Sequence, residues 1–174
     1  RDQAGLLEPN IEFHVDPVDK FLLDDNRVVT RSGKTYEYDI MVMATGSRIV
    51  PDTIPGMAEG AETFYSEAGA VKMFKKLREF EGGRIALVVG VPHKCPIAPV
   101  EAIFSLHDYL KARGIRDKCT IKYHYPIGRL HTIKEVATWV KPHFERMGIE
   151  HETLFNVKEI DPENKVVRSE EGTE

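Results

Sequence analysis

The feature that most constrains the fold is a strand–helix–strand pattern in the second half of the chain. The apolar run from Ile85 to Val89 is typical of a buried strand, and residues Thr120 to Tyr125 predict a second one. Apolar residues at helical spacing lie between them, and Gly114 ends that helix. Two strands joined by a crossover helix lie parallel, with a right-handed connection. We therefore expect an α/β fold with a parallel sheet.

Two more helices flank this pattern. Ser66 can cap a first helix that closes at Gly82-Gly83, and Gly148 ends a last helix that contains Pro142, which should kink it. The predicted apolar faces of the three helices are Ala70, Val71, Phe74 and Leu77; Ile103, Leu106 and Leu110; and Val136, Val140, Phe144 and Met147.

An internal repeat suggests two related domains. Residues 15–39 and 157–174 each contain an apolar strand, an Asp-Pro pair, an Asn-x-Val-Val sequence, and a Gly turn with Thr. The first copy continues into the apolar run Ile40 to Ala44, which predicts a strand buried on both faces. The second copy stops before that point, so we expect a segment of a longer protein. We assign residues 1–50 to a first domain, 51–65 to a Pro- and Gly-containing linker, and 66–174 to a second domain.

Composition excludes several functional classes. The chain carries 24 Lys and Arg against 28 Asp and Glu, without a basic block, so nucleic acid is not an expected partner. No apolar run approaches the roughly 18 residues of a membrane-spanning helix. No signal peptide is visible, and two cysteines are too few for a secreted disulfide framework. The histidines show no metal-ligand spacing, so no metal site is expected.

The turn after the first strand of the sheet would face a ligand in such a fold. A dinucleotide site there would need G-x-G-x-x-G, but only Gly90 is present, and three prolines remove backbone donors from the loop. The loop instead presents Cys95 beside Lys94 and His93, near a helix N-terminus. This electropositive setting favours the thiolate form, which indicates a redox or nucleophilic cysteine. Inert packing is the alternative for Cys95 and the favoured interpretation of Cys119.

Two motifs make a family resemblance specific. Residues 38–48 read Y-D-I-M-V-M-A-T-G-S-R and resemble a strand of the FAD domain in the pyridine nucleotide-disulfide oxidoreductase superfamily. Residues 94–101 read K-C-P-I-A-P-V-E and resemble the cysteine loop of the sulfide:quinone oxidoreductase family. The resemblance implies a central fragment of a flavoprotein with two dinucleotide domains. Its fold would be a Rossmann-like parallel sheet flanked by helices, with a β-meander.

The resemblance also implies site residues. Cys95 would be one half of a redox cysteine pair, with its partner in a later segment. Glu101 matches a glutamate of the family and is a candidate proton acceptor. His131 could replace a histidine that some members carry after glycine, although it lies two residues away. Val100 stands where the family usually has an aromatic residue.

Cofactor and partners follow from the same resemblance. FAD would contact Thr45, Gly46 and Lys94, and most of its site would lie outside this chain. Sulfide and a quinone would be the substrates of an enzyme located in the cytoplasm or at the periphery of a membrane, whereas the fragment alone would be inactive. Two alternatives remain: an NAD(P)H-dependent flavoprotein, such as an NADH dehydrogenase or a disulfide reductase, and a catalytically silent binding module of the same fold.

Overall fold

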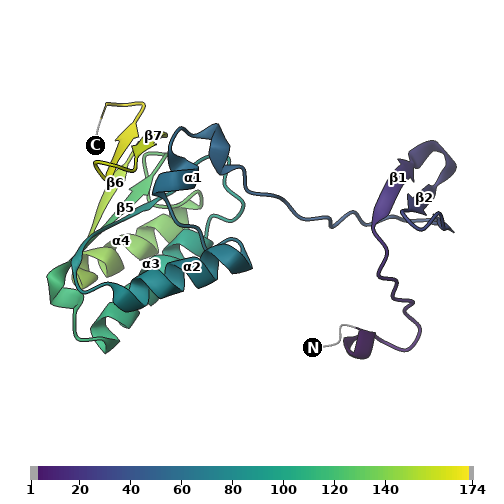
Figure 1. Ribbon diagram of the computed structural model, residues 1–174, viewed down its shortest axis with the longest axis horizontal. Helices are drawn as coiled ribbons and strands as arrows, with labels where there is room; N and C mark the ends of the chain where they lie inside the picture. Colours follow the sequence, from purple (N-terminus) through teal and green to yellow (C-terminus); the bar gives the residue numbers. More distant parts are fainter. Residues whose placement is uncertain (1–3, 173–174) are drawn as a thin grey trace. The chain divides into compact units, whose positions relative to one another are not determined.

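The protein forms two compact units, residues 1–46 and residues 47–174 (Figure 1). The computed structural model describes residues 4–172. In the first unit, three strands form an antiparallel sheet in the order β1-β2-β3. Its elements are the 3-10 helices η1 (Ala4–Leu6) and η2 (Leu23–Asp25) and the strands β1 (Val18–Leu22), β2 (Arg27–Thr30) and β3 (Thr35–Glu37).

The second unit is built on a parallel sheet in the order β4-β5-β6, which confirms the predicted α/β class. The strands are β4 (Gly83–Val88), β5 (Cys119–Tyr125) and β6 (Ile149–Thr153), followed by the antiparallel hairpin β7 (Val157–Asp161) and β8 (Val166–Ser169). The helices are α1 (Met57–Gly60), α2 (Glu67–Glu79), α3 (Ala98–Ala112) and α4 (Lys134–Met147), with the 3-10 helices η3 (Pro51–Thr53) and η4 (Arg116–Lys118).

The core lies between β5 and the helices. Ile121, Tyr123 and Tyr125 alternate along β5 and are fully buried together with residues of α3 and α4. The helical partners are Ile103, Leu110, Val140 and Phe144. Each such side chain contributes about 1.5–3 kcal/mol through removal of apolar surface from water. Figure 1 shows α2, α3 and α4 along the sheet.

The predicted helix ends are largely confirmed. The Ser66 hydroxyl accepts a hydrogen bond from the Gly69 N–H at 3.1 Å, and Gly114 and Gly148 follow α3 and α4 with positive φ. Two expectations need correction. The helix α2 ends at Glu79, before the predicted glycine pair, and Val71 and Phe74 of its expected inner face are exposed.

The first strand of the sheet is less buried than expected. Among the described residues β4 pairs only with β5, so it is an edge strand. Arg84 and Ala86 are exposed, whereas Ile85 and Leu87 pack against the core. Exposed and packed side chains therefore alternate along β4, because only one face of this strand is covered.

The prediction of a buried strand at residues 40–44 is wrong. Ile40 is 87% exposed and Val42 is 85% exposed, and the segment has no regular secondary structure. A strand buried on both faces needs neighbouring strands and covering helices. The described residues provide neither around this segment.

The internal repeat is a structural repeat. In β1–β2 the register runs Val18↔Thr30 to Leu22↔Arg27, and in β7–β8 it runs Val157↔Ser169 to Asp161↔Val166, with a register shift after the first pair of each. Gly33 and Gly172 take equivalent turn positions with φ of +86° and +83°. Equal register and equal turns show that both hairpins are the same supersecondary unit.

The structure shifts the repeat alignment by one residue. Asn26 and Lys165 occupy the equivalent left-handed positions, with φ of 52° and 57°, so Asn26 does not correspond to Asn164. The Asp-Pro pairs are not equivalent either, because Pro17 precedes β1 whereas Pro162 lies in the β7–β8 turn.

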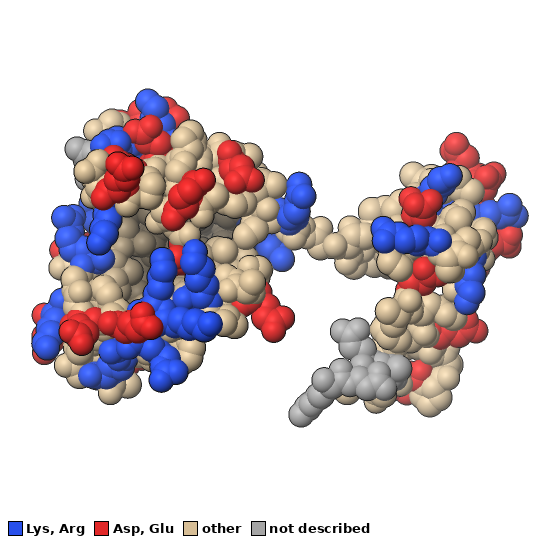
Figure 2. Space-filling view, in the orientation of Figure 1, with Lys and Arg blue, Asp and Glu red and all other residues tan. Residues whose placement is uncertain are grey.

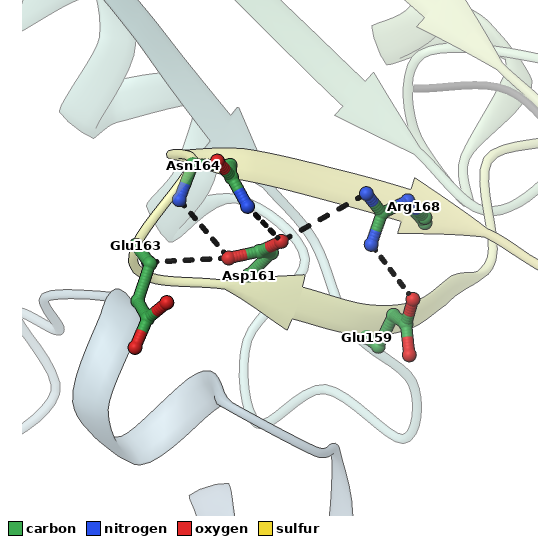
Figure 3. Close-up of polar contacts among 5 residues, drawn as sticks. All are labelled: Glu159, Asp161, Glu163, Asn164 and Arg168. Atoms are coloured by element: carbon green, nitrogen blue, oxygen red, sulfur yellow. Dashed lines mark hydrogen bonds and ion pairs between the residues drawn. The ribbon is translucent and has the colours of Figure 1, made fainter.

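Asp161 closes the β7–β8 turn (Figure 3). Its Oδ1 accepts hydrogen bonds from the backbone N–H groups of Glu163 and Asn164, and its Oδ2 accepts one from the Asn164 side chain at 2.8 Å. These bonds, led by that of the Asn164 side chain, lower the pKa of Asp161. Arg168 bridges the strands by donating to Glu159 at 2.9 Å. The turn is thus closed by side chains that accept otherwise unpaired backbone donors.

Residues 51–61 fold against this second hairpin. The Ile160 N–H donates to the Pro55 carbonyl at 2.9 Å. Gly56 has a φ of +72°, and a Cβ there would lie 1.8 Å from the Ile160 carbonyl oxygen, so only glycine fits. The structure therefore groups this segment with the second unit, while the predicted linker over residues 51–65 stays a prediction.

His124 makes stability depend on pH. The side chain is 3% exposed beside Phe155, and burial lowers its pKa to about 4 from an ordinary value of 6.5. The unfolded chain therefore binds a proton between these two values that the folded chain does not bind. The contribution of His124 to the unfolding free energy is fully present above pH 6.5 and decreases as the pH falls towards 4. Burial also lowers the pKa of His107, which acts in the same direction.

We predict that His124→Gln flattens this dependence. His124 should account for about 3 kcal/mol of the unfolding free energy that the native chain loses between pH 6.5 and 4, since one pKa unit corresponds to about 1.4 kcal/mol. Urea unfolding at a series of pH values measures the loss. Equal slopes for His124→Gln and the native chain would contradict the assignment, and the exposed His14→Gln serves as the control.

Candidate functional site

The candidate site is the loop of residues 89–97 between β4 and α3. The first strand-to-helix connection of a parallel sheet lies at its carboxyl edge, where ligands usually bind. Beside Gly90, an added Cβ would lie 3.5 Å from Ile54 Cδ1 and 3.7 Å from Val157 Cγ1, which are ordinary van der Waals distances. The loop has only the first glycine of the G-x-G-x-x-G pattern that a dinucleotide-binding turn needs.

The start of α3 is also unlike a phosphate site. Ile97 occupies the N-cap without a side-chain hydrogen bond, and Pro99 lies in the first turn. Pro96 and Pro99 have no N–H to offer. The start of α3 therefore offers fewer backbone donors than a phosphate site usually does.

The loop instead holds Cys95 in a half-buried position. The Tyr65 hydroxyl donates a hydrogen bond to the Cys95 carbonyl oxygen at 3.1 Å. On the other side of the exposed Lys94, the His93 Nε2 lies 3.3 Å from the Tyr125 hydroxyl in a hydrogen bond. Tyr65 from the segment before α2 and Tyr125 at the end of β5 thus both bond to the loop.

These phenols remain neutral near pH 7. Burial raises the pKa of Tyr65, and the charge of a Cys95 thiolate raises it further. Burial also raises the pKa of Tyr125.

The other two predicted catalytic residues differ in solvent exposure. Glu101 is exposed in the first turn of α3. His131 is 1% exposed, and its Nδ1 accepts a hydrogen bond from the Ile133 N–H at 3.0 Å. Its Nε2 has no hydrogen-bond partner among residues 4–172. A catalytic role for either residue stays a prediction.

Thr45 and Gly46 are exposed residues at the end of the first unit. Gly46 has a φ of +74°, and nothing lies within 4 Å of where its Cβ would be. Such an open glycine allows a ligand to approach the backbone closely. A role for Thr45 and Gly46 in binding FAD stays a prediction.

Cys119 lies far from this site. It begins β5, whereas Cys95 lies in the loop after β4, so the two cysteines are at opposite ends of a parallel sheet whose strands are about 20 Å long. Its side chain is 7% exposed, and its Sγ donates to the Ile115 carbonyl. The packing interpretation of Cys119 is therefore confirmed, and Cys119 cannot pair with Cys95.

Sequence reasoning missed Tyr65 and Tyr125. Tyr125 ends a strand beside the loop, a position that could have suggested a contact with His93. Tyr65 lies 30 residues before Cys95 in a segment without a strong pattern, and only the folded chain brings its hydroxyl to the loop.

No family model matches the chain, but curated proteins and solved structures do. The sulfide-quinone reductase of Aquifex aeolicus is 30% identical over 94% of this chain and 39% of its own length. The crystal structure of the sulfide:quinone oxidoreductase from Aquifex aeolicus superposes with a TM-score of 0.77 at 28% identity, over 94% of this chain and 40% of that one. The chain is a relative of the sulfide:quinone oxidoreductases.

The relationship extends to eukaryotic proteins. The mitochondrial sulfide:quinone oxidoreductase of Dictyostelium discoideum is 25% identical over 95% of this chain and 38% of its own length. The chain therefore spans about two fifths of the length of these relatives. The resemblance inferred from the K-C-P-I-A-P-V-E loop is confirmed over nearly the whole chain.

The surface agrees with the charge pattern of the sequence. Figure 2 shows basic and acidic side chains intermingled on the visible face of the second unit. Lys72 and Lys76 of α2 both pair with Glu62. Within residues 4–172, none of the helices has the length and apolar content needed to cross a membrane.

We predict that the two thiols differ in reactivity. In the folded chain iodoacetamide should modify the half-buried Cys95 at least about tenfold faster than the buried Cys119, since access and thiolate character control the rate. Peptide mass spectrometry over time measures both sites, and both should react at similar rates in urea. A Cys95 that reacts only after unfolding would be a packing residue.

Proposed function

We propose that this chain is part of an FAD-dependent oxidoreductase of the sulfide:quinone type and contributes its redox Cys95. The observation that carries the proposal is the half-buried Cys95 in the loop after β4, in a chain related to sulfide:quinone oxidoreductases over nearly its whole length. The loop has only Gly90 of the G-x-G-x-x-G pattern, which further supports a thiol site in place of a nicotinamide site.

The proposed chemistry requires a disulfide between Cys95 and a second cysteine supplied by the rest of the protein. Hydrosulfide attacks this disulfide, an S–S bond forms between substrate and enzyme, and the original S–S bond breaks to leave one persulfide and one thiolate. The substrate sulfur is oxidised, and two electrons remain on the thiolate. FAD, when bound, supplies the two-electron carrier between that thiolate and a quinone.

The residues of this chain would have distinct roles. Lys94 would place a positive charge next to the cysteine in sequence and would contact the flavin. Glu101, exposed one helical turn into α3, would accept the proton that the hydrosulfide releases. Thr45 and Gly46 would lie along the flavin. The chain by itself is proposed to be inactive, because its described residues hold only this edge of the flavin site.

The alternative is a nicotinamide-dependent flavoprotein. It would need a pyrophosphate site, and the loop has only Gly90 of the G-x-G-x-x-G pattern. Reduction of the flavin of the whole protein by NADH, with no response to sulfide, would favour this alternative over the proposed function.

We predict that Cys95→Ser in the whole protein abolishes flavin reduction by sulfide, since no disulfide can then form. Flavin content and melting temperature should stay close to native, because Cys95 lies in a loop outside the core. Stopped-flow absorbance of the flavin measures the reaction.

Cys119→Ser is the matched control. The activity of this variant should stay within a few fold of native, because Cys119 only packs at the start of β5. Equal loss of activity in both variants would remove the basis for assigning the chemistry to Cys95.

A further inference from the structure

We infer that Tyr65 is a positioning residue for Cys95, an inference that rests on the proposed redox role of that cysteine. The hydroxyl of Tyr65 donates to the carbonyl of Cys95 at 3.1 Å, across 30 residues of sequence. This contact fixes the main chain at the cysteine and thereby the direction in which its sulfur points.

Tyr65 is itself held firmly. Its backbone N–H donates to Thr63 Oγ1 at 3.2 Å, and the next residue, Ser66, caps α2. An added Cβ at Gly69 would lie 2.5 Å from the Thr63 carbonyl oxygen, so the first turn of α2 packs directly on the segment before it. The phenol therefore reaches the loop from a rigid base.

The main chain at Cys95 has little other freedom. Pro96 follows, and a residue before proline is restricted to extended conformations. The peptide between Cys95 and Pro96 carries no N–H, so its carbonyl is its only hydrogen-bonding group. A hydrogen bond to that carbonyl fixes the peptide plane, and the side-chain rotation of Cys95 is then the main variable left.

A second contact anchors the loop independently. His93 bonds to the hydroxyl of Tyr125, which is fully buried at the end of β5. Loss of the Tyr65 hydroxyl should therefore release the carbonyl of Cys95 without releasing the whole loop. The expected consequence is a local change at the cysteine with little effect on global stability.

Reactivity distinguishes this role from simple packing. The native loop holds Cys95 half-buried, so a freed carbonyl should expose its sulfur more often. At the same time the sulfur of Cys95, when it is part of the disulfide, should less often have the orientation that hydrosulfide attack needs. One substitution should thus raise the rate with a small external reagent and lower the rate of catalysis.

The test compares Tyr65→Phe with Tyr109→Phe in a Cys119→Ser background. Both substitutions remove one hydroxyl and keep the ring, but the ring of Tyr109 lies against Arg113 and its hydroxyl makes no hydrogen bond among the described residues. Tyr65→Phe should raise the rate of Cys95 alkylation by iodoacetamide about 2- to 10-fold, the equivalent of one net hydrogen bond. Tyr109→Phe should leave it unchanged.

The same pair is then measured in the whole protein. For Tyr65→Phe, the kcat for sulfide-dependent quinone reduction should fall about 2- to 10-fold with an unchanged KM for quinone, unchanged flavin content and a melting temperature close to native. A purely structural role would lower flavin content or melting temperature together with activity.

The outcomes distinguish the positioning role of Tyr65 from the proposed redox function of Cys95. An alkylation rate in Tyr65→Phe that equals or falls below that of Tyr109→Phe overturns the positioning role, whatever the activity. Full sulfide activity in Cys95→Ser overturns the proposed function instead, and the alkylation comparison still decides whether Tyr65 controls the cysteine.

Discussion

The burial of β5 is the constraint on which the second unit depends. Ile121, Tyr123 and Tyr125 fill the space beneath α3 and α4 with no exposed surface, and the strand pairs with β4 on one side and β6 on the other. This packing places the end of β5 beside the cysteine loop. The hydroxyl that holds His93 therefore belongs to a residue of the core, and the candidate site is fixed by the same interaction that stabilises the sheet.

Arg116 joins the opposite end of the unit. Its guanidinium donates to His107 of α3, to the carbonyl of Cys119 at the start of β5, and to the carbonyls of Met147 and Gly148 at the end of α4. One planar group with several fixed donors thus connects two helices and the central strand. The end of the sheet at Arg116 is thus stabilised by hydrogen bonds between elements, whereas the other end carries the loop with Cys95.

Local pattern predicted those elements whose own residues determine them. The Ser66 cap, the glycines after α3 and α4, and the apolar strand β5 carry their signals within a few residues. The prediction of a buried strand at residues 40–44 was wrong because burial on both faces depends on neighbouring strands and covering helices, which the described residues do not provide. The repeat was visible in sequence, yet its alignment was off by one residue, because backbone conformation and not residue type marks the equivalent turn position.

The site was predictable to a similar extent. The K-C-P-I-A-P-V-E motif located the cysteine and the family, whereas Tyr65 and Tyr125 carry no motif and depend on long-range folding. A visible spectrum of the whole protein during anaerobic sulfide addition tests the central claim most directly. The account predicts that sulfide bleaches the flavin absorbance near neutral pH and that a soluble quinone restores it. A flavin that NADH bleaches and sulfide leaves unchanged would contradict it.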